Sequence, residues 1–349
     1  MNQPTVSDST SNVLANPGAE LDKPPPLPDL PPVEAPSAGF VVQLFVIPAL
    51  VVLVVIIVYL LFGKMAGGER DAMEYVRQLQ LPTANWRSAF ELASLIQNDP
   101  AVSGDPKLLG ALTELLSREL DHYENPKLRD DPKLAQYVAL TLGAFQTLEA
   151  QTQSGQPVDP LVPLIRALGP QFDPSIRIAA VGSLAKQAAR LNGKLDDPRA
   201  VKALGETAAD GNPQLRQMAV YALGFFGGPD VSPILRDRIQ SDEDRFTRYN
   251  AAVALGRRGD SAAEGTLREM LSTSDLNKLI EMESATEKQN KIEVIQLEAI
   301  EALRTSIRTG EPQLARSLRS ELERLTTSGL VSVRSQALEA LRALEGPKG

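Results

Sequence analysis

Apolar residues recur along the chain in a pattern that predicts one helix after another. In Asn212–Gly227 a capping residue and a proline come first, and Leu215, Met218 and Leu223 follow at helical spacing. With Leu223 as the reference, the pattern recurs at Leu142, Leu184, Leu255, Leu303 and Leu341, in steps of 42, 39, 32, 48 and 38 residues. A repeat of roughly 40 residues is typical of a helical solenoid.

Short polar residues followed by proline mark where the predicted helices begin. Asp173-Pro174 and Asn212-Pro213 open the first helix of a pair, whereas Asp159-Pro160 and Asp197-Pro198 open a second helix. One helix pair cannot cover its own apolar face, so neighbouring pairs must stack. The pattern predicts an all-α fold, and it contains no alternation that would predict a strand.

A motif of Asp/Asn-Pro-x-Leu/Ile-Arg-x-x-Ala-x-x-Ala-Leu-Gly underlies the repeat. It is read at Pro174–Leu184 and Pro213–Gly224, and more loosely at Thr247–Gly256 and Val333–Leu341. The motif resembles HEAT repeats of the short bacterial, PBS-lyase type, over roughly residues 70–345. This resemblance implies an α-solenoid of helix pairs, in a family made up mostly of binding scaffolds with a few enzymes.

The repeat arginine of this family has a structural role. The resemblance implies that it pairs with a cap aspartate of its own or the next unit, and the matching positions here are Arg177, Arg216, Arg248 and Arg334. The aspartates that it suggests as partners are Asp173, Asp210 and Asp242. Ala135 and Gln296 stand where two further repeats would have the arginine.

The chain before the helices has a different composition. Residues 1–39 contain nine of the 26 prolines and five acidic residues, which predicts a disordered tail. Within it, Pro24–Pro32 favours polyproline II, either as a stiff spacer or as a ligand for an aromatic-lined groove. Phe40–Phe62 then has 23 residues without a charge, enough for one transmembrane helix. A signal peptide fits less well, because Lys64 stands where small cleavage-site residues are expected.

Charges beside this span predict its orientation. Only Lys23 precedes the span within about 20 residues, whereas Lys64, Arg70 and Arg77 follow it. Because the more basic side stays in the cytoplasm, we expect a cell (inner) membrane protein with its tail outside and its repeats cytoplasmic.

The remaining boundaries follow from these patterns. We predict a short linker at 63–68, an N-terminal helical cap at 69–131, the repeat solenoid at 132–345 and a disordered end at 346–349. The step of 48 residues contains an insertion, Ser272–Asn290. It is either a loop on the binding face or an extension of a solvated helix.

The composition removes most catalytic and metal sites. With no cysteine and one histidine, the chain lacks the ligands of a structural zinc site or a His-Glu-x-x-His helix. Ser183-Leu-Ala-Lys186 matches a Ser-x-x-Lys motif without its companion motifs, and we interpret it as a chance match. We therefore predict no catalytic residues, no cofactor and no metal. The net charge of −8 argues against nucleic-acid binding.

The second helices of such repeats are expected to line the concave face and to carry the partner-binding residues. Their outward cations are Arg166, Lys202, Arg236, Arg238 and Arg268. The function that follows is a non-enzymatic, membrane-anchored scaffold that binds and positions an unidentified protein partner. Two alternatives stay open: an enzyme of small-molecule or bilin-lyase-like type, and a structural subunit of a membrane complex.

Overall fold

The computed structural model describes residues 47–66, 71–81, 85–125, 131–191 and 193–346. They form two units, one ending at Glu69 and one beginning at Arg70. The predicted tail at 1–39 and the last residues of the predicted end lie outside the described residues. The first seven residues of the predicted span, 40–46, and two residues of the linker also lie outside them.

One helix of the first unit is described, α2 (Ile47–Ala66). Its described large side chains, from Leu50 to Tyr59, are apolar or aromatic and exposed, and Tyr59 is 75% exposed. Over the part of the chain that the structure describes, no helix combines the length and the hydrophobicity needed to cross a membrane.

The second unit begins with four helices. They are α3 (Ala72–Leu79), α4 (Trp86–Asn98), the short α5 (Pro100–Ser103) and α6 (Pro106–Glu124). Aspartate or asparagine side chains accept backbone N–H groups at the first turn of each helix, which satisfies donors that the helix leaves free. Trp86 stacks on Tyr137 at a centroid distance of 4.8 Å, as expected for a tryptophan that packs this end of the array.

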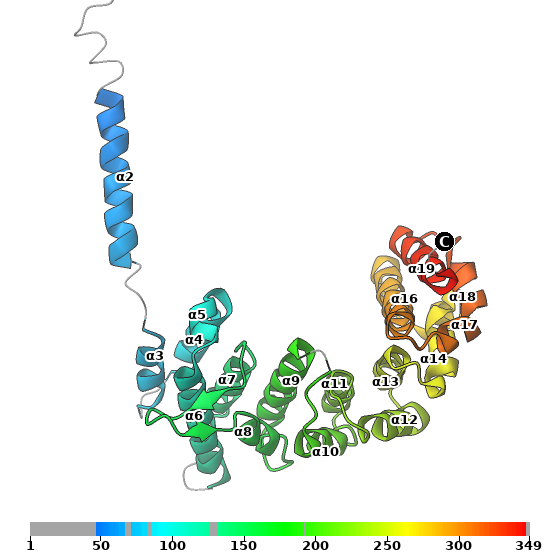
Figure 1. Cartoon of the computed structure of the whole chain (residues 1–349), viewed down its shortest axis with the longest axis horizontal. Coiled ribbons are helices and arrows are strands. Elements are labelled where there is room, and N and C mark those ends of the chain that lie inside the picture. Colours follow the sequence, from blue (N-terminus) through cyan, green and yellow to red (C-terminus); the bar gives the residue numbers. More distant parts are fainter. Residues whose placement is uncertain (1–46, 67–70, 82–84, 126–130, 192, 347–349) are drawn as a thin grey trace, which may run out of the picture. The chain divides into compact units, whose positions relative to one another are not determined.

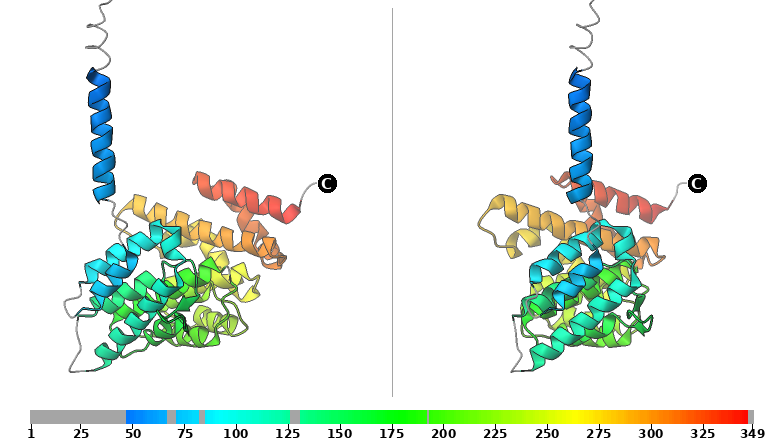
Figure 2. Two further views of the ribbon diagram at one scale, coloured as in Figure 1. Left: turned by 60° about the vertical axis from the view of Figure 1, so that its left-hand side comes forward. Right: turned by 90° about the vertical axis from the view of Figure 1, so that its left-hand side faces the viewer.

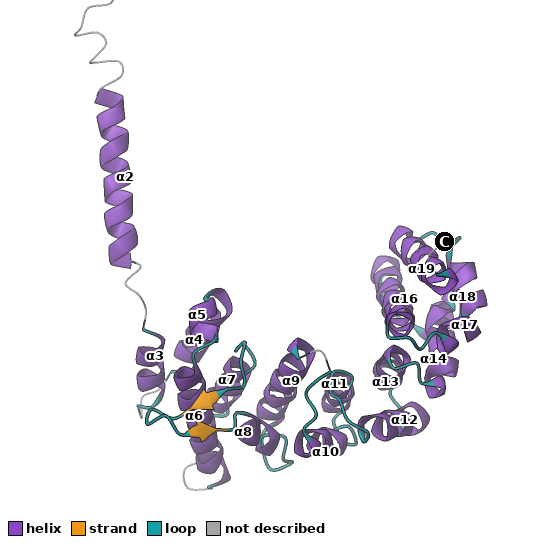
Figure 3. Ribbon diagram, viewed as in Figure 1, coloured by secondary structure: helices purple, strands orange, loops and turns teal. Residues whose placement is uncertain are grey.

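A small hairpin corrects the prediction that strands are absent. β1 (Ala150–Gln151) pairs with antiparallel β2 (Pro157–Val158), and both are drawn in orange in Figure 3. The turn between them is closed by the backbone N–H of Thr152, which donates to the carbonyl of Gln156, and contains Gly155 at φ 83°. Strands of two residues are too short to produce an alternating pattern, so the sequence gives no signal for them.

The rest of the unit is a stack of helix pairs, so the predicted all-helical solenoid is confirmed. We call the helices that carry the repeat motif the first-helix layer: α7 (Lys133–Leu142), α9 (Pro174–Arg190), α11 (Pro213–Leu223), α13 (Arg245–Arg257), α16 (Ala285–Arg308) and α19 (Val331–Glu345). Each member contacts the next, and Figures 1 and 2 show α16 and α19 side by side near the C-terminus.

The second-helix layer packs on the other side of these helices. It comprises α8 (Leu161–Arg166), α10 (Pro198–Thr207), α12 (Val231–Ser241), the 3-10 turn η2 (Ser261–Ala263), α14 (Glu264–Leu271), α17 (Gln313–Ser317) and α18 (Arg319–Leu325). Within this unit, Figure 1 places α9, α11 and α13 on the inner side of the array and α10 and α12 on its outer side. The prediction that the second helices line the concave face is therefore wrong.

Buried apolar residues fill the space between the layers. Ala219 and Leu223 of α11 and Ala251 and Leu255 of α13 have no exposed surface, as expected for the motif positions of a stacked repeat. Small residues let the first helices approach closely. A Cβ added at Gly143 would lie 2.6 Å from the Ser183 hydroxyl of α9.

The repeat arginines connect their helices to neighbouring turns through hydrogen bonds. Arg177 donates to the carboxylate of Asp210 at 2.6 Å, and Arg216 donates to that of Asp242 at 3.2 Å, so each reaches the next repeat as predicted. Arg248 and Arg334 instead donate to backbone carbonyls of the turn before their own helix. Their predicted pairing with aspartate side chains is not found among the described residues.

At two positions related to the repeat arginines, the hydrogen bonds differ from the predicted arginine–aspartate pairs. Asp173 bonds to the backbone N–H and hydroxyl of Ser175 as a helix cap, and it is not an arginine partner. Gln296, which replaces a repeat arginine, donates to the Leu271 carbonyl at 3.4 Å and the Thr273 hydroxyl at 2.9 Å. Gln296 therefore bonds to a turn between helices, as the repeat arginines do, with a shorter polar side chain.

The insertion Ser272–Asn290 forms two helical pieces. Its first part is α15 (Thr273–Leu279), whose cap is the Ser272 hydroxyl. Its last residues form the first turns of the 24-residue α16, which supports the extended-helix alternative for that part. Arg245 of α13 donates to the Leu279 carbonyl at 2.6 Å, which holds α15 against the array.

Candidate functional site

The second-helix cations are largely occupied by carboxylates of this chain. Arg166 bonds to Asp121 and Glu124 of α6, both at 2.6 Å, and these two carboxylates raise its pKa against the effect of burial. Arg236 bonds to Asp260 at 2.7 Å.

The other second-helix cations divide into paired and unpaired ones. Arg238 contacts Asp237 and Asp242 and donates to a backbone carbonyl, and Arg268 lies between Glu264 and Glu321. Lys202 is exposed and has no ion-pair partner among the described residues. Except for Lys202, these residues have little charge left for a partner.

One shallow cavity joins two features that the sequence singled out. Arg268 of α14 and Asp275 and Lys278 of α15 line a space of about 270 Å³. The structure thus brings a predicted partner-binding arginine beside the insertion. Positive and negative groups alternate there, and Arg268 is already paired, which leaves little net charge to attract a ligand.

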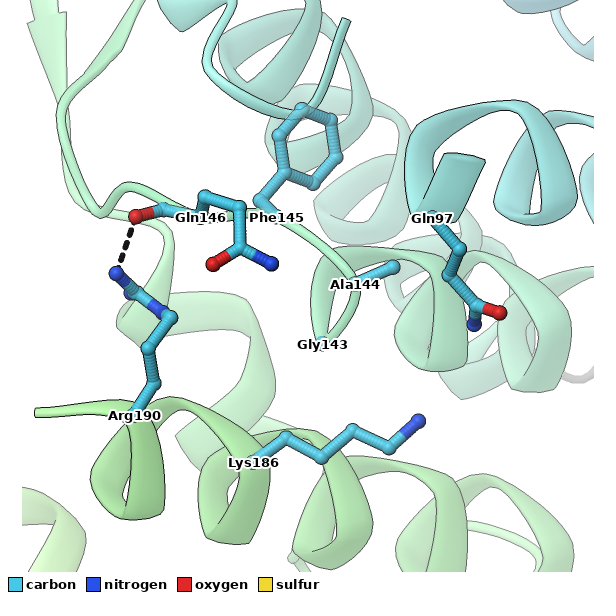
Figure 4. Close-up of a pocket in the computed structure, with 7 residues that line it drawn as sticks. All are labelled: Gln97, Gly143, Ala144, Phe145, Gln146, Lys186 and Arg190. Atoms are coloured by element: carbon cyan, nitrogen blue, oxygen red, sulfur yellow. Dashed lines mark hydrogen bonds between the residues drawn. The ribbon is translucent and has the colours of Figure 1, made fainter. Parts of the chain in front are cut away.

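A second group of cavities lies on the exposed side of the first-helix layer. The first has a volume of about 310 Å³, and we call it the amide cavity. It is lined by Gln97, Gly143, Ala144, Phe145, Gln146, Lys186 and Arg190. Figure 4 shows Lys186 and Arg190 on one side of α9, facing the loop from Gly143 to Gln146.

Buried side chains of α9 fix the wall of the amide cavity. Gln187 donates to the carbonyls of Leu142 and Phe145 at 2.9 and 3.2 Å, which holds the loop in place. Arg190 donates to the Gln146 carbonyl and to the Gln187 side chain, as Figure 4 shows for the first bond. Its Nε is buried without a partner, and burial lowers the pKa of this guanidinium. Lys186 makes no hydrogen bond or ion pair with the described residues.

The Ser183-x-x-Lys186 motif does not form a catalytic pair in this fold. Ser183 is 1% exposed, and its hydroxyl donates to the Ala139 carbonyl of α7 at 2.6 Å. Lys186 lines the amide cavity on the exposed side of the helix. The serine joins two helices, and the lysine is free to meet a ligand.

The second cavity of this group is apolar. It has a volume of about 290 Å³, lies between α9 and α11, and we call it the apolar cavity. Its lining is Val181, Gly182, Ala185, Lys186, Ala189, Met218, Tyr221 and Phe225. Tyr221 is 51% exposed and meets Phe225 edge-on at a centroid distance of 4.9 Å. Small residues on α9 face two aromatic rings, a shape that suits an apolar side chain.

The third cavity is the largest of the group, at about 770 Å³, and we call it the arginine cavity. It is lined by Gly193, Gly224, Phe225, Phe226, Gly227, Arg257, Arg258, Glu301, Thr305, Arg308 and Thr309. The Arg257 guanidinium lies 5.4 Å from the centroid of the Phe225 ring. Arg258 donates to three backbone carbonyls, and its pKa is lowered by burial and by the neighbouring Arg257.

The three cavities adjoin one another. Lys186 lines both the amide and the apolar cavity, and Phe225 lines both the apolar and the arginine cavity. We call the continuous surface the first-helix groove. Five cationic side chains and one carboxylate, Glu301, line it, although the chain carries a net charge of −8. Sequence reasoning missed it because its residues come from separate repeats.

Within the described ranges, no three His, Asp or Glu side chains are arranged to hold a metal ion. The single carboxylate of the arginine cavity, Glu301, bonds to Arg304 at 3.2 Å and to Arg308 at 2.7 Å.

Comparisons with known proteins gave a family match and similar solved structures. Residues 158–256 match the family model for HEAT repeats, so the chain contains a HEAT-repeat region. A designed armadillo repeat protein is similar at 16% identity and a TM-score of 0.32, over 78% of this chain and 98% of its own. Human deoxyhypusine hydroxylase in complex with glycerol is similar at 17% identity and a TM-score of 0.29, over 81% and 98%. No curated protein matches the chain.

Proposed function

We propose that this chain is a membrane-anchored HEAT-repeat scaffold that binds and positions a protein partner and carries out no chemistry itself. The observation that carries the proposal is the first-helix groove, where five cations meet an aromatic wall with one carboxylate among them. Aromatic and arginine side chains are the residues that contribute most at protein interfaces. A groove lined by residues of five successive repeats suits a peptide better than a small molecule.

The ionisable groups of the arginine cavity favour binding over catalysis. Arginine keeps its proton at all physiological pH values, so it cannot act as a general base. Glu301, the one carboxylate, is held by two arginines. A proton-transfer site needs a group poised to accept or release a proton, and this lining provides electrostatic attraction instead.

The anchor in this proposal rests on the sequence of Phe40–Phe62. Its 23 uncharged residues suffice for one crossing at a rise of about 1.5 Å per residue. Sixteen of them fall within α2, which begins at Ile47, and the described apolar side chains of that helix are exposed. The bases Lys64, Arg70 and Arg77 after the span favour cytoplasmic repeats.

Reporter cysteines test the orientation, because the chain has no cysteine of its own. Ser11→Cys reports on the tail. Gly329→Cys reports on the repeats, since a side chain there meets no atom within 4 Å. A membrane-impermeant thiol reagent on intact cells should label the first variant and spare the second. Labelling of Gly329→Cys without labelling of Ser11→Cys would show the opposite orientation. Labelling of both variants would contradict the membrane anchor.

Partner capture tests the groove itself. The full chain in detergent is compared with a Tyr221→Ala, Arg257→Gln variant and with the control Lys107→Gln, which removes an exposed cation of α6. Captured proteins are identified and quantified by mass spectrometry. We expect specific partners to be lost from the groove variant and retained by the control. The same partners at the same yield on all three proteins would refute the groove as the binding site.

A further inference from the structure

The two ends of the first-helix groove carry cations that the chain does not neutralise. At the amide cavity, Lys186 has no described partner and Arg190 is bonded to uncharged groups. At the arginine cavity, Arg257 lies over Phe225 and forms no ion pair with the described residues, although the carboxylate of Glu298 is near enough to interact with it electrostatically. These side chains therefore keep their charge for a ligand, in contrast to the paired arginines of the second helices.

The middle of the groove selects a different kind of group. Gly182, Ala185 and Ala189 leave space beside α9, and Tyr221 and Phe225 provide the opposite wall. A side chain that fills this space buries apolar surface on both sides, at roughly 25 cal/mol for each Å² removed from water. Lys186 is the one charged residue of this lining, so a charged group placed away from it would lose hydration without gaining a partner.

The spacing of the cations sets a length. Lys186 lies on α9 and Arg257 at the end of α13, with α11 between them. Neighbouring packed helices are about 8–10 Å apart, so the two cations are separated by roughly 16–20 Å. An extended chain advances about 3.3 Å per residue, which corresponds to five or six residues.

We propose that the groove binds an extended acidic segment of a partner protein, with two carboxylates about six residues apart and an apolar residue midway between them. The inference rests on the proposed function and specifies the chemistry of its partner. One carboxylate pairs with Lys186 beside the amide cavity, the apolar residue fills the apolar cavity, and the other carboxylate pairs with Arg257.

A synthetic peptide tests this arrangement directly. The probe is Asp-Ser-Pro-Leu-Pro-Ser-Asp with blocked ends, labelled through a Gly-Gly spacer, and its prolines favour an extended backbone. Binding to the full chain in detergent is measured by fluorescence anisotropy. Replacing both aspartates by asparagine should weaken binding about fivefold, since each exposed ion pair contributes modestly. Replacing leucine by serine should weaken it about tenfold or more, and added salt should weaken the parent peptide most.

Variants of the chain assign each end of the peptide. In Lys186→Gln, replacing the aspartate that pairs with Lys186 by asparagine should not lower the affinity further. In Arg257→Gln, the same should hold for the aspartate at the other end of the peptide. The control Lys107→Gln should bind like the parent chain. A loss of fold would instead reduce the affinity for every peptide equally and change the circular dichroism, so the end-specific pattern separates pairing from misfolding.

Three results would overturn the inference. The first is equal affinity for the aspartate and asparagine peptides. The second is equal sensitivity of both ends in both variants. The third is that the parent chain does not bind the peptide and the Arg257→Gln chain has a different oligomer mass, which would show that the groove binds a second copy of this chain. If groove variants lose captured partners while the peptide fails, the scaffold function stands and only the acidic motif is wrong.

Discussion

Replacing Arg216 by methionine tests whether the repeat arginines hold the stack together. The side chain is 8% exposed and bonds to the carboxylate of Asp242, which is 1% exposed. It also donates to the carbonyls of Asp210 and Gly211 at 3.0 and 3.3 Å. Methionine keeps most of the aliphatic volume and removes the charge and all of these bonds.

The expected magnitude follows from what remains around Asp242. Among the described cations, Arg238 at 3.7 Å is then left to face this buried carboxylate, to which the backbone N–H of Asp244 also donates at 2.9 Å. Removing one partner of a buried ion pair costs about 3–5 kcal/mol. Because Arg238 still neutralises part of the charge, we expect a loss at the lower end, about 3 kcal/mol. The bond to Glu243 adds little, since that carboxylate is 87% exposed.

The assay is urea unfolding of the segment Arg70–Gly349, followed by circular dichroism. Arg236→Met is the matched control: this arginine is 52% exposed and bonds to Asp260, and its loss should cost less than about 1 kcal/mol. Adding Asp242→Asn to Arg216→Met should recover part of the loss, because it removes the uncompensated buried charge. Equal losses for Arg216→Met and Arg236→Met, or no recovery in the double variant, would refute the reasoning.

Three further predictions concern the same segment. Leu223→Ala, at a fully buried site, should cost about 2–5 kcal/mol in urea unfolding. Desolvation opposes the lowered pKa of Asp210, but bonds from the Asn212 backbone and Arg177 outweigh it, so the stabilisation is present at neutral pH and lost as pH falls below about 4. Asp210→Asn should flatten that acid limb of the thermal midpoint against pH. Gly228→Ala should destabilise by about 1 kcal/mol or more in thermal unfolding, because φ is +91° and the new Cβ would lie 2.3 Å from an Asp196 oxygen.

Local signals in the sequence were sufficient for the helices. Asp173-Pro174 and Asn212-Pro213 predict helix starts, and α9 and α11 begin at Pro174 and Pro213, with caps that accept the N–H groups of the following residues. A capping residue and the N–H groups that it accepts are only a few residues apart, so this interaction can be predicted from the sequence alone. The hairpin at β1 and β2 was missed because two-residue strands have no period.

The candidate site required information that chain order does not contain. The sequence places Glu264 at helical spacing from Arg268, but the second partner of Arg268, Glu321, is 53 residues away in sequence. Lys186 drew attention only through its distance from Ser183, whereas its neighbours in the groove come from α4, α11 and the loop after α7. Repeat stacking decides which side chains adjoin, and the variable steps between repeats prevent a simple count from predicting it.

The arginines of this chain divide by what they face, and this division identifies the binding side. Buried repeat arginines such as Arg216 face carbonyls and aspartates of adjoining turns, where their role is structural. Second-helix arginines such as Arg166 are neutralised by carboxylates of the same chain. At the groove, Arg257 faces an aromatic ring, a contact that positions a guanidinium without cancelling its charge. In a chain with an excess of acids, the described cations that form no ion pair are the ones available to attract an acidic partner.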